Sequence, residues 1–187
     1  MSTAVTVRRA TEAELPWIWR LVHAEYLRRG LITPEMDGMF SHYQHLDCIS
    51  DTVPLVAVDG ERLVGTMTTT FDGPRGLPTD SEYPDETGEL RMWHKLATCW
   101  RMATDIECHS SHAVSAALMA ATAKMLMDHG EPTVLMECHP RHSLYYRKRI
   151  GFEIYAKRDE TPGLTNAPSV LMVGGTGSYS RLLKYVT

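Results

Sequence analysis

The sequence predicts a single α/β domain built on a mixed β-sheet. The dipeptide Asp59-Gly60 separates two β-rich runs and predicts an antiparallel hairpin, because its tight turn requires positive φ angles. Apolar runs at 96–106 and 133–137 flank a helical stripe, and this strand-helix-strand order requires a parallel pair. A chain of 187 residues can build one full core but not two comfortable ones, so we expect residues 1–187 to form one domain.

The N-terminal segment predicts a strand followed by a helix. Residues 4–10 alternate apolar and polar side chains, and Thr11 with Glu14 forms the capping-box pattern of a helix start. Gly30 is suited to end this helix. Its apolar face consists of Leu15, Ile18, Trp19, Val22 and Tyr26. For residues 34–47 the pattern predicts one or two short helices.

The middle of the chain predicts the hairpin strands 53–58 and 63–71, followed by a long loop over 72–88. The loop is inferred from its density of helix and strand breakers, which are Gly73, Pro74, Gly76, Pro78, Pro84 and Gly88. Loops of this length in compact domains are usually functional. A short helix over 89–93 then precedes the strand 96–106.

The C-terminal half alternates helices and strands. A long helix begins near Ser110 or Ser111 and ends at Gly130. Its apolar stripe is formed by Val114, Ala117, Leu118, Ala121, Met125 and Leu126. The remaining elements are strands at 133–137, 152–156 and 170–173 and a short helix at 139–149 that has Pro140 in its first turn.

Composition limits the partners and the compartment. The net charge of −4 does not favour nucleic acid, so any anion site must be local. Arg8 and Arg9 are followed by Thr11 and Glu14 instead of an apolar region, so we expect no signal peptide, and no run approaches the roughly 18 apolar residues of a membrane span. The cysteines contain no C-x-x-C pair, so we expect reduced thiols and a cytoplasmic protein; they are Cys48, Cys99, Cys108 and Cys138.

A short motif, E-C-H-x-x-H, occurs at 107–112 and again at 137–142. Each copy lies where a predicted strand passes into a helix, so parallel neighbouring strands would bring both copies to one sheet edge, where α/β ligand sites usually lie. Cysteine and histidine can bind zinc, but neither copy has a known zinc spacing. We therefore expect no metal site. Cys99 or Cys138 beside a histidine could act as a nucleophile, although free cysteines are more often simply buried.

A basic cluster follows the second copy of this motif. It consists of Arg141, Arg147, Lys148 and Arg149. In an acidic chain this cluster is suited to a phosphate or to an acidic partner protein, and the alternative is a solvated helix face. The sequence contains none of the common nucleotide-binding, metalloprotease or serine-hydrolase motifs.

The order of elements, together with the stretch HPRHSLYY at 139–146 and Gly151-Phe152 after it, resembles the GNAT superfamily of N-acyltransferases. The closer resemblance is to the long-chain N-acyl amino acid synthases, which are related to the autoinducer synthases. Further segments similar to that family occur in the same order, over about residues 20–172. They are YLRRG at 26–30, VGT at 64–66 with Asp72, GLP at 76–78 before Leu90-Arg91, and TNAPSVL at 165–171.

This resemblance implies a GNAT-like, mostly antiparallel central sheet with a splayed parallel strand pair, flanked by helices. It also implies that a medium or long fatty acyl group moves from the thioester of an acyl carrier protein to a small amine, with an amino acid as the first candidate, by direct attack. Divergence of the parallel strands would free backbone N–H groups around Met102, Ala103 and Thr104 to hold the pantetheine arm and polarise the thioester. Trp100 beside them offers a flat surface for an acyl chain.

The donor is expected to be a carrier protein. CoA-using relatives hold pyrophosphate on a basic, glycine-rich turn, whereas residues 105–112 read DIECHSSH, with two acids and no glycine, lysine or arginine. An acidic carrier would dock on Arg141, Arg147, Lys148 and Arg149. Acyl-phosphopantetheine is then the co-substrate, with acyl-CoA as the alternative and no tightly bound cofactor. A CoA-dependent acetyltransferase and a non-catalytic acyl-binding or regulatory module remain open.

The resemblance also suggests catalytic residues. Thr98 and Arg101 occupy a position where the related synthases have a Glu-x-x-Arg-like pattern, so the acid is missing. Because Thr98 cannot be a general base, that role would fall to water, to His139 or His109, or to Glu107. Tyr146 resembles the tyrosine that protonates the leaving thiolate in CoA-using relatives. Four residues separate it from Gly151-Phe152, whereas three do so in those relatives. The alternative role of Tyr146 is packing of its helix.

Overall fold

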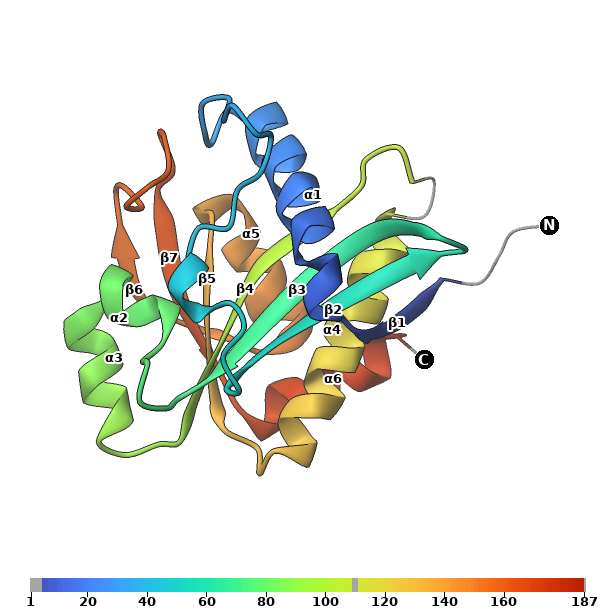
Figure 1. Cartoon of the computed structure of the whole chain (residues 1–187). Coiled ribbons are helices and arrows are strands. Elements are labelled where there is room, and N and C mark those ends of the chain that lie inside the picture. The colour runs from blue at the N-terminus through green and yellow to red at the C-terminus, as the bar shows by residue number, and fades with distance from the viewer. Residues whose placement is uncertain (1–4, 109–110, 187) are drawn as a thin grey trace.

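The computed structural model describes residues 5–108 and 111–186, which form a seven-stranded sheet with helices on both faces (Figure 1). The strands are β1 (Thr6–Arg9), β2 (Thr52–Asp59), β3 (Arg62–Phe71), β4 (Leu96–Thr104), β5 (Thr133–Cys138), β6 (Glu153–Arg158) and β7 (Ser169–Gly174). Their order is β1-β2-β3-β4-β5-β7-β6, and every neighbouring pair is antiparallel except β4 and β5. This arrangement confirms the predicted fold class.

The helices divide between the two faces of the sheet. They are α1 (Leu15–Arg28), α2 (Pro78–Glu82), α3 (Pro84–Arg91), α4 (Ser111–Asp128), α5 (Pro140–Tyr145) and α6 (Thr176–Val186), with single turns at Glu12–Glu14, Gln44–Leu46 and Tyr146–Ile150. Figure 1 shows α1 in front of the sheet and α4 and α6 behind it. Because successive side chains of a strand point to opposite faces, β4 packs Ala97 and Cys99 into the core under α4, while Leu96 packs with α2 and α3.

Helix α1 begins where the capping-box pattern predicts. The Glu14 carboxylate accepts a hydrogen bond from the backbone N–H of Thr11 at 2.8 Å and forms an ion pair with Arg8 at 2.6 Å. The bond from Arg8, followed by the one from Thr11, lowers the pKa of Glu14 to about 2. The first turn of the chain's first helix is therefore stabilised by a carboxylate that stays charged over most of the pH range.

Replacing Glu14 with glutamine is expected to lower the free energy of unfolding by about 1 kcal/mol near neutral pH, because the amide loses the ion pair. The pKa of Glu14 is depressed in the folded protein, so its contribution is present above its usual value of 4.5 and is lost as the pH falls towards about 2. Urea unfolding of both proteins across this range measures the difference. It should shrink at low pH, and a difference that is independent of pH would contradict the assignment.

Two segments differ from the prediction. Residues 72–88, predicted as a loop, contain α2 and most of α3, because Pro78 and Pro84 stand at the first helical positions, where a missing N–H costs no hydrogen bond. The short helix predicted at 89–93 is the end of α3. Residues 34–47, predicted to be helical, form an irregular loop with one turn at Gln44–Leu46.

The C-terminal elements follow the prediction more closely. Strand β4 ends at Thr104, two residues before the predicted end, because the backbone N–H of Asp105 bonds to Val64 and starts a turn. The helix predicted at 139–149 is present, with a wider last turn that ends at Gly151, whose φ is +83°. The sequence pattern does not predict α6, which packs Tyr179 and Leu182 into the core.

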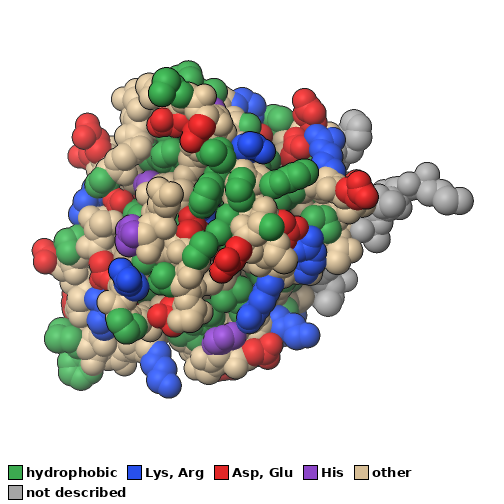
Figure 2. Space-filling model, viewed as in Figure 1, with side chains coloured by type: hydrophobic (Ala, Val, Ile, Leu, Met, Phe, Trp, Pro, Cys, Tyr) green, Lys and Arg blue, Asp and Glu red, His purple; other side chains and the backbone are tan. Residues whose placement is uncertain are grey.

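The surface carries no dominant charge on the face that Figure 2 shows, where acidic and basic side chains are interspersed. This distribution agrees with the small net charge of −4. Within the described ranges, none of the helices is long and apolar enough to cross a membrane. An anion site would therefore have to be built locally, from a few cations gathered at one place.

Candidate active site

The parallel strands β4 and β5 pair only over their first residues. Their register joins Leu96–Cys99 to Thr133–Met136, and the described part of β5 provides no ladder partner for the rest of β4. On its other edge, β4 shifts register against β3 around Arg101, whose φ of +52° lies in the left-handed region. A non-glycine residue in that region marks a bulge, which bends the strand. The strand pair therefore splays after Cys99, as the family resemblance implies.

A cavity of about 410 Å³ opens where the two strands diverge. Its walls come from α1, the loop over residues 31–51, α2, β4, β5, α5 and the segment before β7. Strand alternation gives the cavity two chemically different sides. Cys99 and Met136 point to the face covered by α4, whereas Thr98 points to the face covered by α2.

The side towards α4 is lined by sulfur-containing side chains, and we call it the sulfur lobe; it consists of Met67, Cys99, Met136 and Cys138. Burial raises the pKa of both Cys99 and Cys138 to about 12. Both side chains therefore remain thiols near neutral pH, and a thiol is a much poorer nucleophile than a thiolate. The sulfur lobe is a soft apolar surface of the kind that accommodates a hydrocarbon chain, and it does not support the nucleophile hypothesis.

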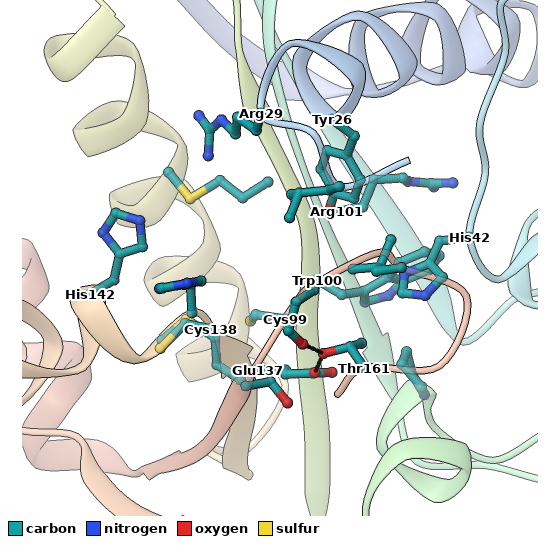
Figure 3. A pocket seen from close by; sticks show the side chains of 18 of the residues that line it. Tyr26, Arg29, His42, Cys99, Trp100, Arg101, Glu137, Cys138, His142 and Thr161 are labelled. Atoms are coloured by element: carbon teal, nitrogen blue, oxygen red, sulfur yellow. Dashed lines mark hydrogen bonds between the residues drawn. The ribbon is translucent and has the colours of Figure 1, made fainter. Parts of the chain in front are cut away.

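The opposite side contains a carboxylate, and we call it the acid lobe; it consists of Tyr43, Thr79, Thr98, Glu137 and Thr161. The hydroxyl of Thr161 donates to Glu137 Oε1 at 2.9 Å, a contact that is drawn in Figure 3. Thr98 is only 1% exposed, and its hydroxyl shares a hydrogen bond with Thr79 at 3.3 Å. Glu137, at the end of β5, is thus the carboxylate that the structure supplies in this lobe.

Hydrogen bonds to the histidines indicate which ring nitrogen could take a proton. His139 lines the cavity, but its Nδ1 accepts the backbone N–H of Arg141 at 3.2 Å, so its neutral ring carries the proton on Nε2. That ring is a donor towards the cavity and is poorly suited to be the predicted general base. His42 has the reverse arrangement, since its Nε2 lies 3.3 Å from the carbonyl oxygen of Pro162. Burial lowers the pKa of His42, so this ring is mainly neutral near neutral pH.

Of the other two candidate bases, Glu107 does not line the cavity. Glu107 is exposed in the turn after β4, where it pairs with Arg62 at 3.2 Å, because the turn leads away from the splay. His109 lies outside the described residues. The residues that the structure describes contain no group of three or more His, Cys, Asp or Glu side chains arranged for a metal ion.

Arg101 borders the cavity, but its guanidinium is occupied elsewhere. Its two terminal nitrogens donate to the carboxylate of Asp47 at 3.0 and 2.7 Å, and its Nε donates to Thr68 at 3.2 Å. Both side chains of the ion pair are buried, and the guanidinium also lies 4.4 Å from the Trp100 ring. Asp47 accepts further bonds from Ser41 and from Trp19 of α1. Arg101 therefore anchors the loop over residues 31–51 to β4 and does not offer its charge to a ligand.

The remaining predicted donor-binding residues lie along the splay. Trp100, Met102 and Thr104 line the cavity, whereas the side chain of Ala103 packs against α1. Tyr146 also lines the cavity, and burial raises its pKa, so its hydroxyl keeps its proton and can donate. The chemical roles assigned to these residues stay predictions.

Basic side chains stand at the other end of the cavity. Arg29 at the end of α1 and Arg141 in α5 line it, and Figure 3 shows Arg29 far from Glu137. The rest of the predicted docking cluster follows in the turn after α5, where all three side chains are exposed: Arg147, Lys148 and Arg149. The basic end of the cavity, at Arg141, is thus close in the chain to the exposed cluster at 147–149.

Several cavity residues were missed by sequence reasoning. Glu137 belongs to the second E-C-H-x-x-H copy, and its position at the end of a strand beside the splay was the available signal. Tyr43 comes from the loop over residues 31–51, in which local pattern predicts no such role. Arg29 was part of a segment used only for the resemblance.

Comparison with known proteins gives consistent results. The model of one protein family, described as N-acyl amino acid synthase FeeM, matches residues 18–174. The structure of FeeM, an N-acyl amino acid synthase from uncultured soil microbes, has 21% sequence identity to this chain and a TM-score of 0.81, with coverage of 98% of this chain and 99% of that one. A search of curated proteins finds no match.

Two other solved structures share the fold. The CoA-dependent acyl-homoserine lactone synthase BjaI, with SAM and isopentyl-CoA, has 19% identity and a TM-score of 0.66 over 98% of this chain and 90% of that one. Aminoglycoside acetyltransferase AAC(6')-Ib, in complex with coenzyme A and kanamycin, has 16% identity and a TM-score of 0.61 over 95% and 98%. These likenesses confirm the GNAT-like architecture expected from the sequence.

Proposed function

The chain belongs to the N-acyl amino acid synthase FeeM family and is an acyltransferase, and from this premise we propose that it moves a medium or long fatty acyl group from an acyl carrier protein thioester to a small amine. An amino acid is the first acceptor to test. One observation carries the proposal: the cavity at the splay combines an apolar sulfur lobe, a carboxylate in the acid lobe and a basic end formed by Arg29 and Arg141. These three environments suit an acyl chain, an ammonium group and a phosphorylated donor arm, respectively.

The reaction proceeds by direct attack. The ammonium acceptor first releases one proton, and its nitrogen then forms a bond to the thioester carbonyl carbon as the C–S bond breaks. The second proton that the nitrogen loses replaces the one taken up by the departing sulfur, which leaves as a thiol. Glu137 holds the ammonium form of the acceptor through a charge-assisted hydrogen bond. Backbone N–H groups of Met102 to Thr104, at the splay, polarise the thioester oxygen, and Tyr146 donates a proton to the leaving sulfur.

A carrier protein is the better donor for the charges present. Asp105 and Glu107 in the turn after β4 share Arg62 at 2.5 and 3.2 Å, so this turn presents acids where CoA pyrophosphate would require cations. The exposed cations lie after α5 instead, and a carrier protein is acidic. Both features favour docking of a protein-bound phosphopantetheine arm over binding of free CoA.

The test is thiol release from matched acyl thioesters, from acetyl to palmitoyl, presented on carrier protein and on CoA, with and without a pool of amino acids. We expect release from long-chain carrier thioesters that depends on the amine, and an amide product of the summed mass. Release from short CoA thioesters would instead make the protein a CoA-dependent acetyltransferase. Absence of release from every donor by the folded protein would overturn the proposal.

Charge reversal of the exposed cluster tests the docking surface. Lys148→Glu is expected to raise the KM for the acyl-carrier substrate about three- to tenfold and to weaken its dependence on salt. The KM for the same acyl chain on free pantetheine should not change. Lys124→Glu, an equal change at an exposed site on α4, is the matched control. Equal effects of both variants, or an effect on acyl-pantetheine, would contradict docking at this cluster.

A further inference from the structure

A second carboxyl group lies directly behind the acid lobe. Glu82, at the end of α2, is 2% exposed, and its Oε1 accepts a hydrogen bond from the Tyr43 hydroxyl at 2.6 Å. Its other oxygen, Oε2, is buried and has no hydrogen-bond partner among the described residues. Tyr43 lines the cavity, whereas Glu82 does not. Tyr43 is therefore the link between this buried carboxyl and the place where an acceptor would bind.

The hydrogen bond to Glu82 determines what Tyr43 can do towards the cavity. A phenol has one proton, and that proton is directed to Glu82, so the oxygen can only accept a hydrogen bond from a ligand. The ring is held in place, since it packs edge-on against Trp100 with centroids 5.2 Å apart and contacts the His42 ring at a tilt of 33° with centroids 4.1 Å apart. Tyr43 thus offers a fixed acceptor to an N–H donor in the acid lobe.

The surroundings of Glu82 favour uptake of a proton. Among the described residues, the charged or titratable groups that act on it are Tyr43 from the loop over residues 31–51, Glu137 from β5 and Arg158 from β6. Burial is the main cause that raises the pKa of Glu82, and the charge of Glu137 raises it further, while Tyr43 and Arg158 act in the opposite direction. A carboxylate with a raised pKa is a stronger base near neutral pH than an ordinary one.

We propose that Tyr43 and Glu82 form a proton relay that deprotonates the acceptor amine. The inference rests on the proposed function, because it requires an amine that binds as ammonium. An N–H bond of the ammonium breaks as its proton bonds to the Tyr43 oxygen, and the Tyr43 O–H bond breaks as that proton bonds to Glu82 Oε1. The electron pair left on nitrogen attacks the thioester. After the product leaves, the proton returns through Tyr43 to water in the open cavity.

Two substitutions remove the relay with little change in shape. Tyr43→Phe keeps the ring contacts, and Glu82→Gln keeps the volume and an oxygen acceptor. Each is expected to lower kcat/KM for an alkylamine acceptor about tenfold, because Glu137 and water remain as poorer routes for the proton. The double variant should be no worse than either single one, since both remove one pathway. Tyr83→Phe is the matched control, because it removes a buried hydroxyl that bonds to Ser169 at 2.7 Å outside the relay.

Two further readouts separate a relay from a packing role. The wild type should lose activity as the pH falls through the raised pKa of Glu82, because the protonated group cannot accept a proton, and this step should be missing in Glu82→Gln. Hydroxylamine, which is neutral at the assay pH, needs no deprotonation before attack. With it, Tyr43→Phe and Glu82→Gln should regain the wild-type rate.

The outcomes distinguish the relay from the function on which it rests. A wild type that acylates amines while both variants match it would overturn the relay alone. The same conclusion follows if the variants are equally slow with hydroxylamine. A folded wild type that acylates no amine at all would overturn the proposed function and the relay with it.

Discussion

Replacing Asp47 with asparagine is expected to lower the free energy of unfolding by about 3–5 kcal/mol, because the substitution leaves a buried guanidinium without its counter-charge. The side chains of Arg101 and Asp47 are 1% and 4% exposed and lie 2.7 Å apart. Their bonds join β4 to the loop over residues 31–51, and Trp19 of α1 binds the same carboxylate at 3.1 Å. The loss should also release the loop that carries His42 and Tyr43 into the cavity.

Thermal unfolding and urea titration measure this effect. For a chain of this size, we expect the Tm of Asp47→Asn to fall by about 6–20 °C. The matched control is Arg62→Ala, which breaks the exposed pairs with Asp105 and Glu107 and should change the Tm much less. If Asp47→Asn were as stable as Arg62→Ala, the buried pair would not be the anchor of the loop.

The second large effect concerns catalysis. Glu137→Gln is expected to lower kcat/KM for the amine about 10- to 100-fold, the usual loss when a charged partner of a hydrogen bond is removed. Stability should change little, because Thr161 can still donate to the amide oxygen that replaces the carboxylate oxygen. The expected change is therefore specific to the acceptor.

Steady-state rates measured at varied amine concentration and saturating donor give kcat/KM for the amine. Hydrolysis of the thioester without amine should be unchanged in Glu137→Gln, which shows that the donor still binds. Glu153→Gln, at an exposed position on β6, provides the control for loss of a negative charge. An unchanged kcat/KM for the amine in Glu137→Gln would remove Glu137 from the acceptor site and move the ammonium elsewhere in the cavity.

Local sequence signals were sufficient where a short-range backbone preference decides the structure. The predicted hairpin forms, and its turn is Gly60-Glu61, with Gly60 at a φ of +62°, because Asp59 pairs with Arg62. The pair Thr11 and Glu14 caps the single turn Glu12–Glu14, which leads directly into the first helix. The strand-helix-strand order of β4, α4 and β5 was enough to predict the one parallel pair, because no short turn can join parallel neighbours.

Local prediction of helices and loops fails where one residue type favours different structures at different positions. Pro78 and Pro84 disfavour a helix interior but favour a helix start, and counting them as breakers turned two helices into a loop. The segment over residues 34–47 is irregular partly for local reasons, since Gly38 and His42 have φ angles of +64° and +67°. Its path follows from Asp47, which is bound by Arg101 from a strand 54 positions away in the chain.

The sequence by itself determined the class of the sheet and the parallel pair, and its motifs carry the family resemblance, which in turn implied the splay with Thr98, Arg101 and Tyr146 near it. Those properties depend on local patterns and on the order of elements. Only the tertiary structure decided which of the polar groups meet: it paired Arg101 with Asp47, left Glu107 in an exposed turn, and placed Glu137 and Tyr43 in one cavity with Glu82 behind Tyr43. The reason is physical, because side chains from separate segments come together through packing and through the need to pair buried polar groups, and neither can be deduced from local sequence alone.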